Sequence, residues 1–207
     1  MRSSSILLRL HFFAISISAL AGCHSGGTEE WAGGNAKQLS VSKKINGLQI
    51  TVKFLPPSHL AEIESRKTGS RLNESQRDSL IKVYSKSFAF SMSIGPDEAV
   101  SSTGDVMTQG IVSQEQFNER INQLNFHMEE MLALRIGNTD SSPVMAIMES
   151  TGGLSVHRNF YIVFPRTKQQ SIKDADPVEV IFQDAVFDTG RSYYPFSGKV
   201  ISDSNPQ

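Results

Sequence analysis

Two stretches in which apolar and polar residues alternate constrain the fold of this 207-residue chain more than any other feature. They are residues 48–54 (LQITVKF) and 88–94 (FAFSMSI). Successive side chains of a β-strand point to opposite faces of a sheet, so alternation gathers the apolar side chains of each stretch on one face. Both stretches therefore predict strands with one buried face and one face in contact with water.

Five later segments predict further short strands, at residues 130–136, 144–148, 160–164, 178–182 and 194–196. The third of these is almost wholly apolar, which predicts a strand covered on both faces. Short strands at near-regular spacing, with turn-forming residues between them, indicate an antiparallel sheet or a sandwich.

Three helices are expected, at residues 58–63, 73–83 and 113–123. The second and third begin with a capping-box spacing, Asn73 with Gln76 and Ser113 with Gln116. The stretch after residue 121 fits a continuing helix as well as a strand, and we expect the strand by residue 130. The chain is thus predicted to be α+β, with an antiparallel β-sheet or sandwich of about six or seven strands and two or three inserted helices.

The segment 95–112 is a long polar connection between the second strand and the third helix. Loops of this length without secondary structure are uncommon in compact domains and tend to be functional or mobile. We therefore expect this segment to be functional or mobile.

The first 22 residues have the three parts of an export signal: a basic start, an apolar stretch at 12–20 and a small-residue end. That stretch is too short to cross a membrane, because a spanning helix needs about 20 apolar residues. The next residue is Cys23, and Leu20-Ala21-Gly22-Cys23 resembles the lipobox of bacterial lipoproteins at every position. The alternative is a cleaved secretory signal followed by an incidental cysteine.

The resemblance implies cleavage before Cys23, a diacylglyceryl group on its sulfur and usually acylation of the new amino group. Two or three acyl chains would make a nearly permanent anchor, whereas one chain binds a membrane only marginally. By analogy with such lipoproteins, His24 at the next position favours the outer membrane. We expect a signal peptide at 1–22, a lipidated flexible tether at 23–46 and a single globular domain at 47–207.

Charge and cysteine content limit what the protein can bind and how it can be cross-linked. Beyond the predicted leader, 18 basic and 21 acidic residues leave a net charge of −3, and the basic residues are scattered. Nucleic-acid binding is therefore not expected, since it usually needs a clustered basic surface. Cys23 is the only cysteine, which predicts no disulfide within the chain, and no cofactor motif is recognised.

Three groups of polar residues are candidates for chemistry, and each has a simpler explanation. His127 with Glu129 and Glu130 could offer metal ligands, but they form only one i, i+3 pair, so a solvated face is favoured. Ser155 and His157 lie two residues apart, but the sequence around them lacks the second glycine of a nucleophile elbow.

The third group is Asp184 and Asp188 with Glu179 nearby. Glycoside hydrolysis uses two carboxyl groups roughly 5–10 Å apart. Aspartates beside a turn are commonly turn residues, because their side chains bind the local backbone. No catalytic, cofactor-binding or metal site is therefore predicted, and lipidation at Cys23 is the one modification expected.

The sequence thus favours a non-enzymatic binding or accessory module, bound to the membrane through Cys23, that presents its domain to a protein or glycan partner. The alternative is an envelope hydrolase. It requires Asp184, Asp188, His157 or Glu149 to meet in one concave pocket.

Overall fold

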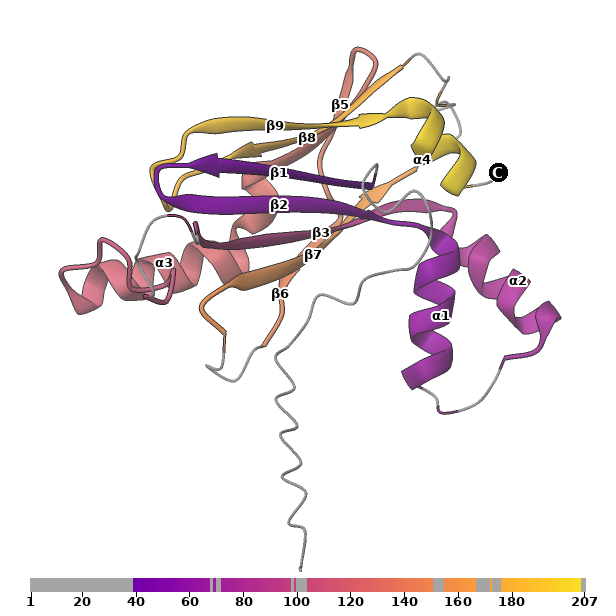
Figure 1. Cartoon of the computed structure of the whole chain (residues 1–207), viewed down its shortest axis with the longest axis horizontal. Helices are drawn as coiled ribbons and strands as arrows, with labels where there is room; N and C mark the ends of the chain where they lie inside the picture. The colour runs from indigo at the N-terminus through magenta and orange to yellow at the C-terminus, as the bar shows by residue number, and fades with distance from the viewer. Residues whose placement is uncertain are drawn as a thin grey trace, which may run out of the picture. The chain divides into compact units, whose positions relative to one another are not determined.

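The structure, a computed structural model, describes residues 39–67, 69, 72–97, 99, 104–150, 155–166, 172 and 176–205. Within these residues, two antiparallel sheets pack together and helices lie at their ends (Figure 1). The five-stranded sheet has the order β1-β2-β3-β7-β6, and the four-stranded sheet has the order β5-β4-β8-β9. The predicted α+β class is confirmed.

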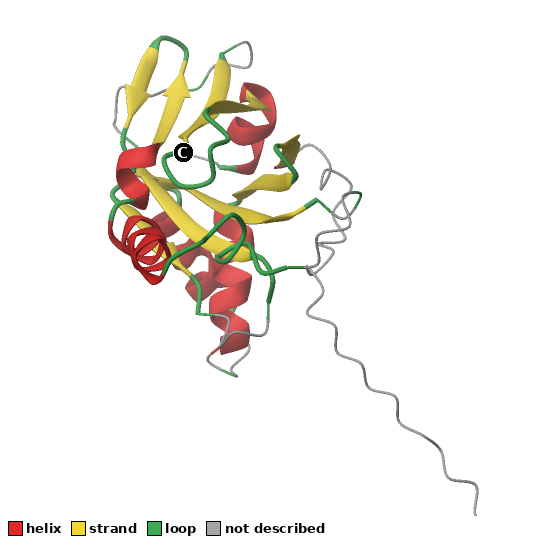
Figure 2. Cartoon of the chain, turned by 90° about the vertical axis from the view of Figure 1, so that its left-hand side faces the viewer, coloured by secondary structure: helices red, strands yellow, loops and turns green. Residues whose placement is uncertain are grey.

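The strands are β1 (Ser40–Ile45), β2 (Leu48–Leu55), β3 (Ser87–Pro96), β4 (Leu132–Ile136), β5 (Thr139–Ser141), β6 (Met145–Met148), β7 (Arg158–Pro165), β8 (Pro177–Gln183) and β9 (Arg191–Ser197). The helices are α1 (Pro57–Lys67), α2 (Glu74–Tyr84), α3 (Gln114–Phe126), the 3₁₀ turn η2 (Met128–Met131) and α4 (Gly198–Ser204). Figure 2 shows both classes of element from the side.

The core lies between the two sheets and is rich in phenylalanine. Phe90 of β3 is fully buried and lies 5.4 Å from Phe54 of β2 and 5.9 Å from Phe164 of β7, measured between ring centroids. It also lies 5.4 Å from Phe196 of β9, which belongs to the other sheet. This contact across the layers makes the two sheets a sandwich, because apolar faces of both sheets are buried against each other.

The seven predicted strands and three predicted helices are present, but the strand expected at 130–136 begins only at Leu132, because residues 130 and 131 belong to η2. The structure also adds to both classes of element. The strands β1 and β5 and the short helix α4 were not expected. β5 has only three residues. β7 buries one face fully and the other by half, so its coverage on both faces is only partial.

The predicted tether at 23–46 needs correction, because β1 occupies residues within it and Leu39 is already buried. β1 pairs with β2 through a tight turn at Asn46 and Gly47, whose φ angles are 50° and 76°. An Asn-Gly pair adopts this left-handed backbone readily, which makes it a strong hairpin signal. The body of the protein thus begins before residue 40, not at Gly47.

Both predicted helix starts are confirmed. The Asn73 side chain accepts a hydrogen bond from the Gln76 backbone at 2.9 Å, and the Gln76 side chain accepts one from the Asn73 backbone at 3.0 Å. Ser113 accepts a hydrogen bond from the Gln116 backbone at 3.2 Å. The ambiguous stretch after residue 121 is helical to Phe126, because the buried Leu124 and its neighbours continue one helical face.

The sandwich has two unlike ends. At the helical end, β1 begins at Ser40 and the helices α1, α2 and α4 gather; this end lies at the right of Figure 1. At the loop end, at the left, lie the turn 46–47, the segment 104–112, α3, the residues 155–157 and the turn 184–190. No helix in the described part of the chain is long and apolar enough to cross a membrane.

Candidate functional site

Arg120 holds the loop end together. It lies on the face of α3 that also carries Leu124, and its Nη1 donates to the carbonyl oxygens of Val106, Met107 and Gln109 at 2.8–3.2 Å. Its Nη2 donates to the Val186 carbonyl at 3.3 Å. One guanidinium group therefore joins the 104–112 segment, α3 and the 184–190 turn.

The surroundings of this arginine are partly apolar. The guanidinium carbon lies 5.0 Å from the ring centroid of Phe187, within the range of a cation–π contact. Burial lowers the pKa of Arg120, while the carboxylate of Asp184 opposes that shift. Arginine nevertheless stays charged in proteins, so this is a permanent cation bound by backbone carbonyls.

A second cation fixes the same segment from the other side. Arg158, at the start of β7, is 9 % exposed and binds the Asp105 carboxylate at 2.6 Å. Its Nη1 donates to the carbonyl oxygens of Ser155 and His157 at 2.7 and 2.9 Å. Between these two anchors the segment buries Val106, which is fully inaccessible to solvent. The described part of the predicted functional loop is therefore tightly bound to the sandwich.

Asp184 closes the neighbouring turn. Its carboxylate accepts hydrogen bonds from the backbone N–H groups of Val186, Phe187 and Thr189 and from the Thr189 hydroxyl, at 2.7–3.1 Å. Four donors on one carboxylate fix the shape of a loop that has no regular secondary structure. This turn places Ala185 and Val186 beside α3.

A groove with a volume of about 530 Å³ lies between α3 and that turn. Its walls combine apolar, carboxylate and amide side chains, including Ile111, Glu115, Gln116, Glu119, Gln123 and Val186. Arg120 forms part of its floor. The groove is concave and lined mostly by polar side chains, with an apolar contribution from Ile111, Ala185 and Val186.

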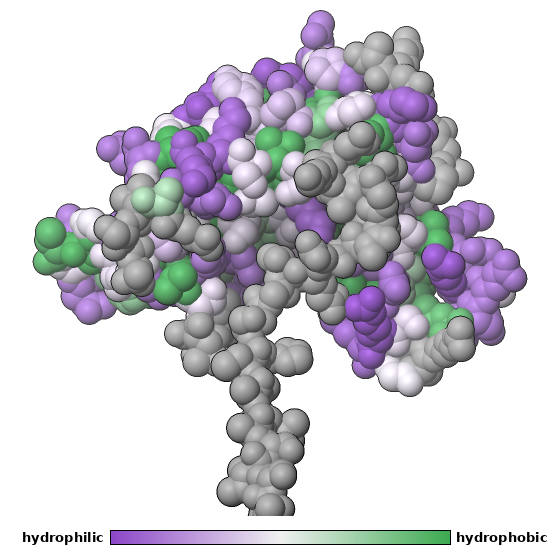
Figure 3. Space-filling model, viewed as in Figure 1, coloured by the Kyte–Doolittle hydropathy of each residue, from purple (hydrophilic) through white to green (hydrophobic). Residues whose placement is uncertain are grey.

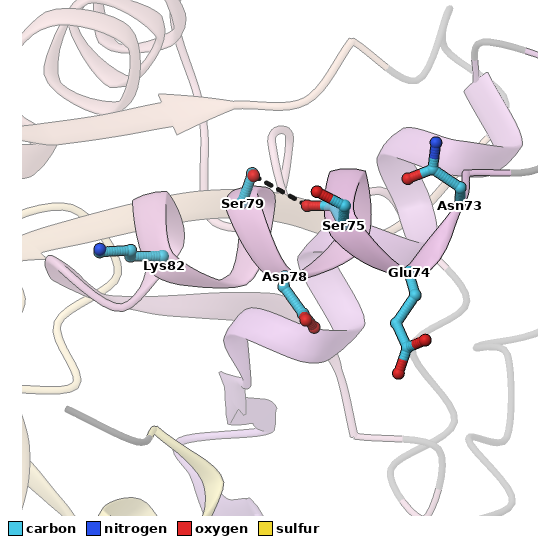
Figure 4. Close-up of a pocket in the computed structure, with 6 residues that line it drawn as sticks. All are labelled: Asn73, Glu74, Ser75, Asp78, Ser79 and Lys82. Carbon is cyan, nitrogen blue, oxygen red and sulfur yellow. Dashed lines mark hydrogen bonds between the residues drawn. The ribbon is translucent and has the colours of Figure 1, made fainter.

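Other hollows do not gather functional groups. One of about 670 Å³ runs along α2, and Figure 4 shows its six residues spread along the helix and pointing in different directions. Asn73 there caps the helix, and the Ser79 hydroxyl donates to the Ser75 carbonyl. Another, of about 600 Å³, lies between α1 and α2 and is lined by charged side chains such as Glu62 and Arg77.

The predicted metal candidates have structural roles. His127 Nδ1 lies 2.9 Å from a Glu130 carboxylate oxygen. The Glu129 carboxylate accepts a hydrogen bond, at 3.3 Å, from the Ala146 backbone N–H on the edge strand β6. In the part of the chain that the structure describes, no group of three or more His, Cys, Asp and Glu residues is arranged to hold a metal.

Ser155 and His157 do not form a nucleophile and base. The Ser155 hydroxyl accepts a hydrogen bond from the His157 backbone at 3.1 Å, which is a local turn contact. The His157 ring lies directly over Gly95 of β3, in the space that a Cβ atom would occupy. The ring therefore covers a glycine on the sheet.

The acidic candidates lie apart. Glu179 lies in β8 near the helical end, about 16 Å along the strand from Asp184 at roughly 3.3 Å per residue. Asp188 is an exposed turn residue with a φ angle of 59°, and Glu149 is exposed after β6. Neither these residues nor His157 line the groove.

Sequence reasoning did not identify Arg120 or Arg158. Arg120 is the only basic residue of α3 and lies on its apolar face, at the i, i+3 and i+4 spacing that joins Phe117, Ile121 and Leu124. A charged residue on an apolar helix face indicates a cation that is bound within the fold, since buried cations are almost always paired. Cys23 lies outside the described residues.

Comparison with known proteins gives little further information. No family model matches the sequence, and no curated protein matches it. The chain is similar to a crystal structure from Burkholderia pseudomallei described as a novel protein of unknown function, at 8% identity and a TM-score of 0.40, covering 83% of this chain and 84% of that one.

Proposed function

We propose that this protein is a non-enzymatic binding module, attached to the bacterial envelope through lipid on Cys23, whose groove beside α3 receives a protein or glycan partner. The observation that supports this most is the position of the groove relative to the start of the domain. The described chain enters β1 at the helical end, and the groove lies at the opposite end.

The separation of the two ends matters for a protein that is anchored through its N-terminal part. β2 has eight residues and runs the length of the sheet, so the two ends are about 25 Å apart at roughly 3.3 Å per residue. A lipid at Cys23 would tie the helical end to the membrane side. The groove would then lie at the end of the domain that is farther from the attachment point, where a partner can reach it.

The fixed geometry of the groove also favours binding. Its two sides are joined by Arg120, and the turn on one side is fixed by Asp184. A surface that is already ordered loses less conformational entropy when a partner binds. Loops held on a rigid scaffold are common locations for binding sites.

The hydrolase alternative loses support for a specific reason. Asp184 uses its carboxylate oxygens to bind its own turn, and the His157 ring lies on Gly95. A general acid or base must reach the proton that it transfers, so residues engaged in this way are poor candidates.

Two measurements test the proposal. Cys23→Ala should move the protein from the membrane fraction to the soluble fraction of the envelope; continued retention in the membrane would contradict lipid anchorage. A diazirine amino acid placed at Gln116 in the groove should form adducts in living cells, whereas the same amino acid at Asp78 on α2 should not. Adducts from position 78 alone would contradict binding at the loop end.

A further inference from the structure

We infer that the groove beside α3 takes a protein segment in which basic side chains lie next to apolar ones. This inference rests on the proposed function and specifies the partner. It follows from the charge of the groove, from its apolar wall and from an exposed apolar tip at its mouth.

The helix side of the groove is acidic. Glu115 and Glu119 are exposed, lie one helical turn apart on α3 and line the groove together with Gln123. Residues at i and i+4 are neighbours on a helix surface, about 6 Å apart. The Glu119 carboxylate accepts a hydrogen bond from the Gln123 amide at 2.8 Å, which restrains its position on the helix.

The one cation of the groove is turned inward. Arg120 donates from its two Nη atoms to four backbone carbonyls and covers the Phe187 ring, so these donors are used within the protein, and its Nε is buried without a hydrogen-bond partner among the described residues. The groove therefore presents acceptors and negative charge to a partner. A lysine or arginine side chain complements this surface, and charge complementarity increases both the rate and the specificity of association.

The opposite wall and the mouth of the groove are apolar. Val186 and Ile111 line it, and Val112, directly before α3, is 86% exposed. Figure 3 shows apolar surface at the tip of the loop end, at the far left, where α3 begins. Exposed ion pairs contribute little each, so the affinity for a charged segment also requires apolar contacts such as these.

A peptide-binding measurement tests the inference on the mature protein, expressed with Cys23→Ser so that it stays in solution. The probes are two fluorescein-labelled peptides of one design, three leucines and three charged residues spaced by serines. One carries lysines and the other glutamates. Fluorescence anisotropy should show binding of the lysine peptide that weakens as salt rises, and no binding of the glutamate peptide.

Variants locate the site. Glu115→Gln with Glu119→Gln should weaken binding of the lysine peptide at least tenfold, and Val112→Ser should weaken it about threefold. The matched control, Glu74→Gln with Asp78→Asn on α2, removes the same charge from the helical end and should change the affinity by less than twofold. All these side chains are exposed, and circular dichroism verifies that each variant is folded.

Three outcomes would overturn the inference: equal binding of the glutamate peptide, unchanged binding by the groove variant, or an equal loss in the α2 control. Each is distinguishable from a failure of the proposed function. Adducts formed in cells from position 116, combined with indifference to the lysine peptide, would leave the binding module in place and refute only the basic partner.

Discussion

The two ends of the sandwich are held by different kinds of interaction. At the helical end, a cluster of apolar side chains joins α1 to the five-stranded sheet; its members are Leu55, Leu60, Ile63, Tyr84, Ala89 and Tyr161. At the loop end, Arg120, Arg158 and Asp184 bind backbone groups or a carboxylate. Among the described residues of the helical end, Arg166 donates to the Ser85 and Asn205 carbonyls and Arg135 binds the Asp140 carboxylate. Arg120, by comparison, donates to four backbone carbonyls.

This difference has a consequence for function. Apolar contacts are non-directional, so an apolar cluster tolerates small shifts of a helix. Hydrogen bonds to a buried cation require defined positions for every partner. The loop end is therefore the part of the molecule in which backbone geometry is fixed most closely, and it is the part that contains the groove.

The largest effect is expected from Arg158→Ala at the loop end. Removing one member of a buried ion pair typically costs about 3–5 kcal/mol, and the 32% exposure of the Asp105 side chain places this case near the lower figure. Urea denaturation measures the change. The matched control at the helical end, Arg66→Ala, breaks an exposed pair with Glu62 and should cost less than about 1 kcal/mol. Equal losses of unfolding free energy in both variants would show that the arginine at the loop end stabilises the fold no more than the one at the helical end.

Leu60→Ala at the helical end should produce the next effect. Leu60 is 8% exposed, and truncating a buried leucine costs about 2–5 kcal/mol, with the low end expected for a small cluster near the surface. The change should lower the free energy of unfolding without altering affinity for the lysine peptide. A loss of peptide binding in folded Leu60→Ala would mean that the two ends are coupled.

The two ends also differ in how much of each could be predicted from sequence. At the helical end, α1 and α2 follow from local patterns, the apolar residues of α1 and the capping spacing of Asn73 with Gln76, whereas the short helix α4 was not predicted. The loop end depends on bonds between distant residues. Arg120 reaches carbonyls 11 to 66 residues away, and Asp105 and Arg158 are 53 residues apart. No periodicity records such pairings, so the groove was not predicted.

The strand β1 was missed for another reason. Its sequence, SVSKKI, is polar enough to resemble the glycine-rich residues before it. It is held in place by pairing with β2 across the Asn46-Gly47 turn, and not by its own apolar content. For β1, the Asn46-Gly47 turn is therefore a better indicator of a hairpin than the composition of the strand.

Gly95→Ala should give an intermediate effect at the loop end. An added Cβ would overlap the His157 ring, and overpacking of this kind typically costs about 1–3 kcal/mol. The double variant Gly95→Ala with His157→Ala should recover most of the lost stability, because the ring that causes the overlap is gone. Thermal unfolding of the two single variants and the double variant measures the coupling. Additive losses would show that the ring does not occupy the space over Gly95.

The smallest effect is a difference in acid stability between the two ends. A hydrogen bond from Lys44, 2.6 Å away, is the main cause that lowers the pKa of Asp97 at the loop end, and Arg135 lowers the pKa of Asp140 beside the β4–β5 turn at the helical end. A carboxyl group whose pKa is lower in the folded state stabilises the protein above its unfolded pKa of about 3.9. That stability is lost as the pH falls through the lowered value.

Lys44→Met should therefore destabilise the protein at pH 6, and its urea midpoint should converge with that of the wild type below pH 3. Arg135→Met should behave in the same way, and its effect should be the larger one because Arg135 binds Asp140 through two hydrogen bonds, at 2.7 and 2.9 Å. A larger effect for Lys44→Met would reverse the comparison, since it would make this exposed lysine a principal support of the loop end.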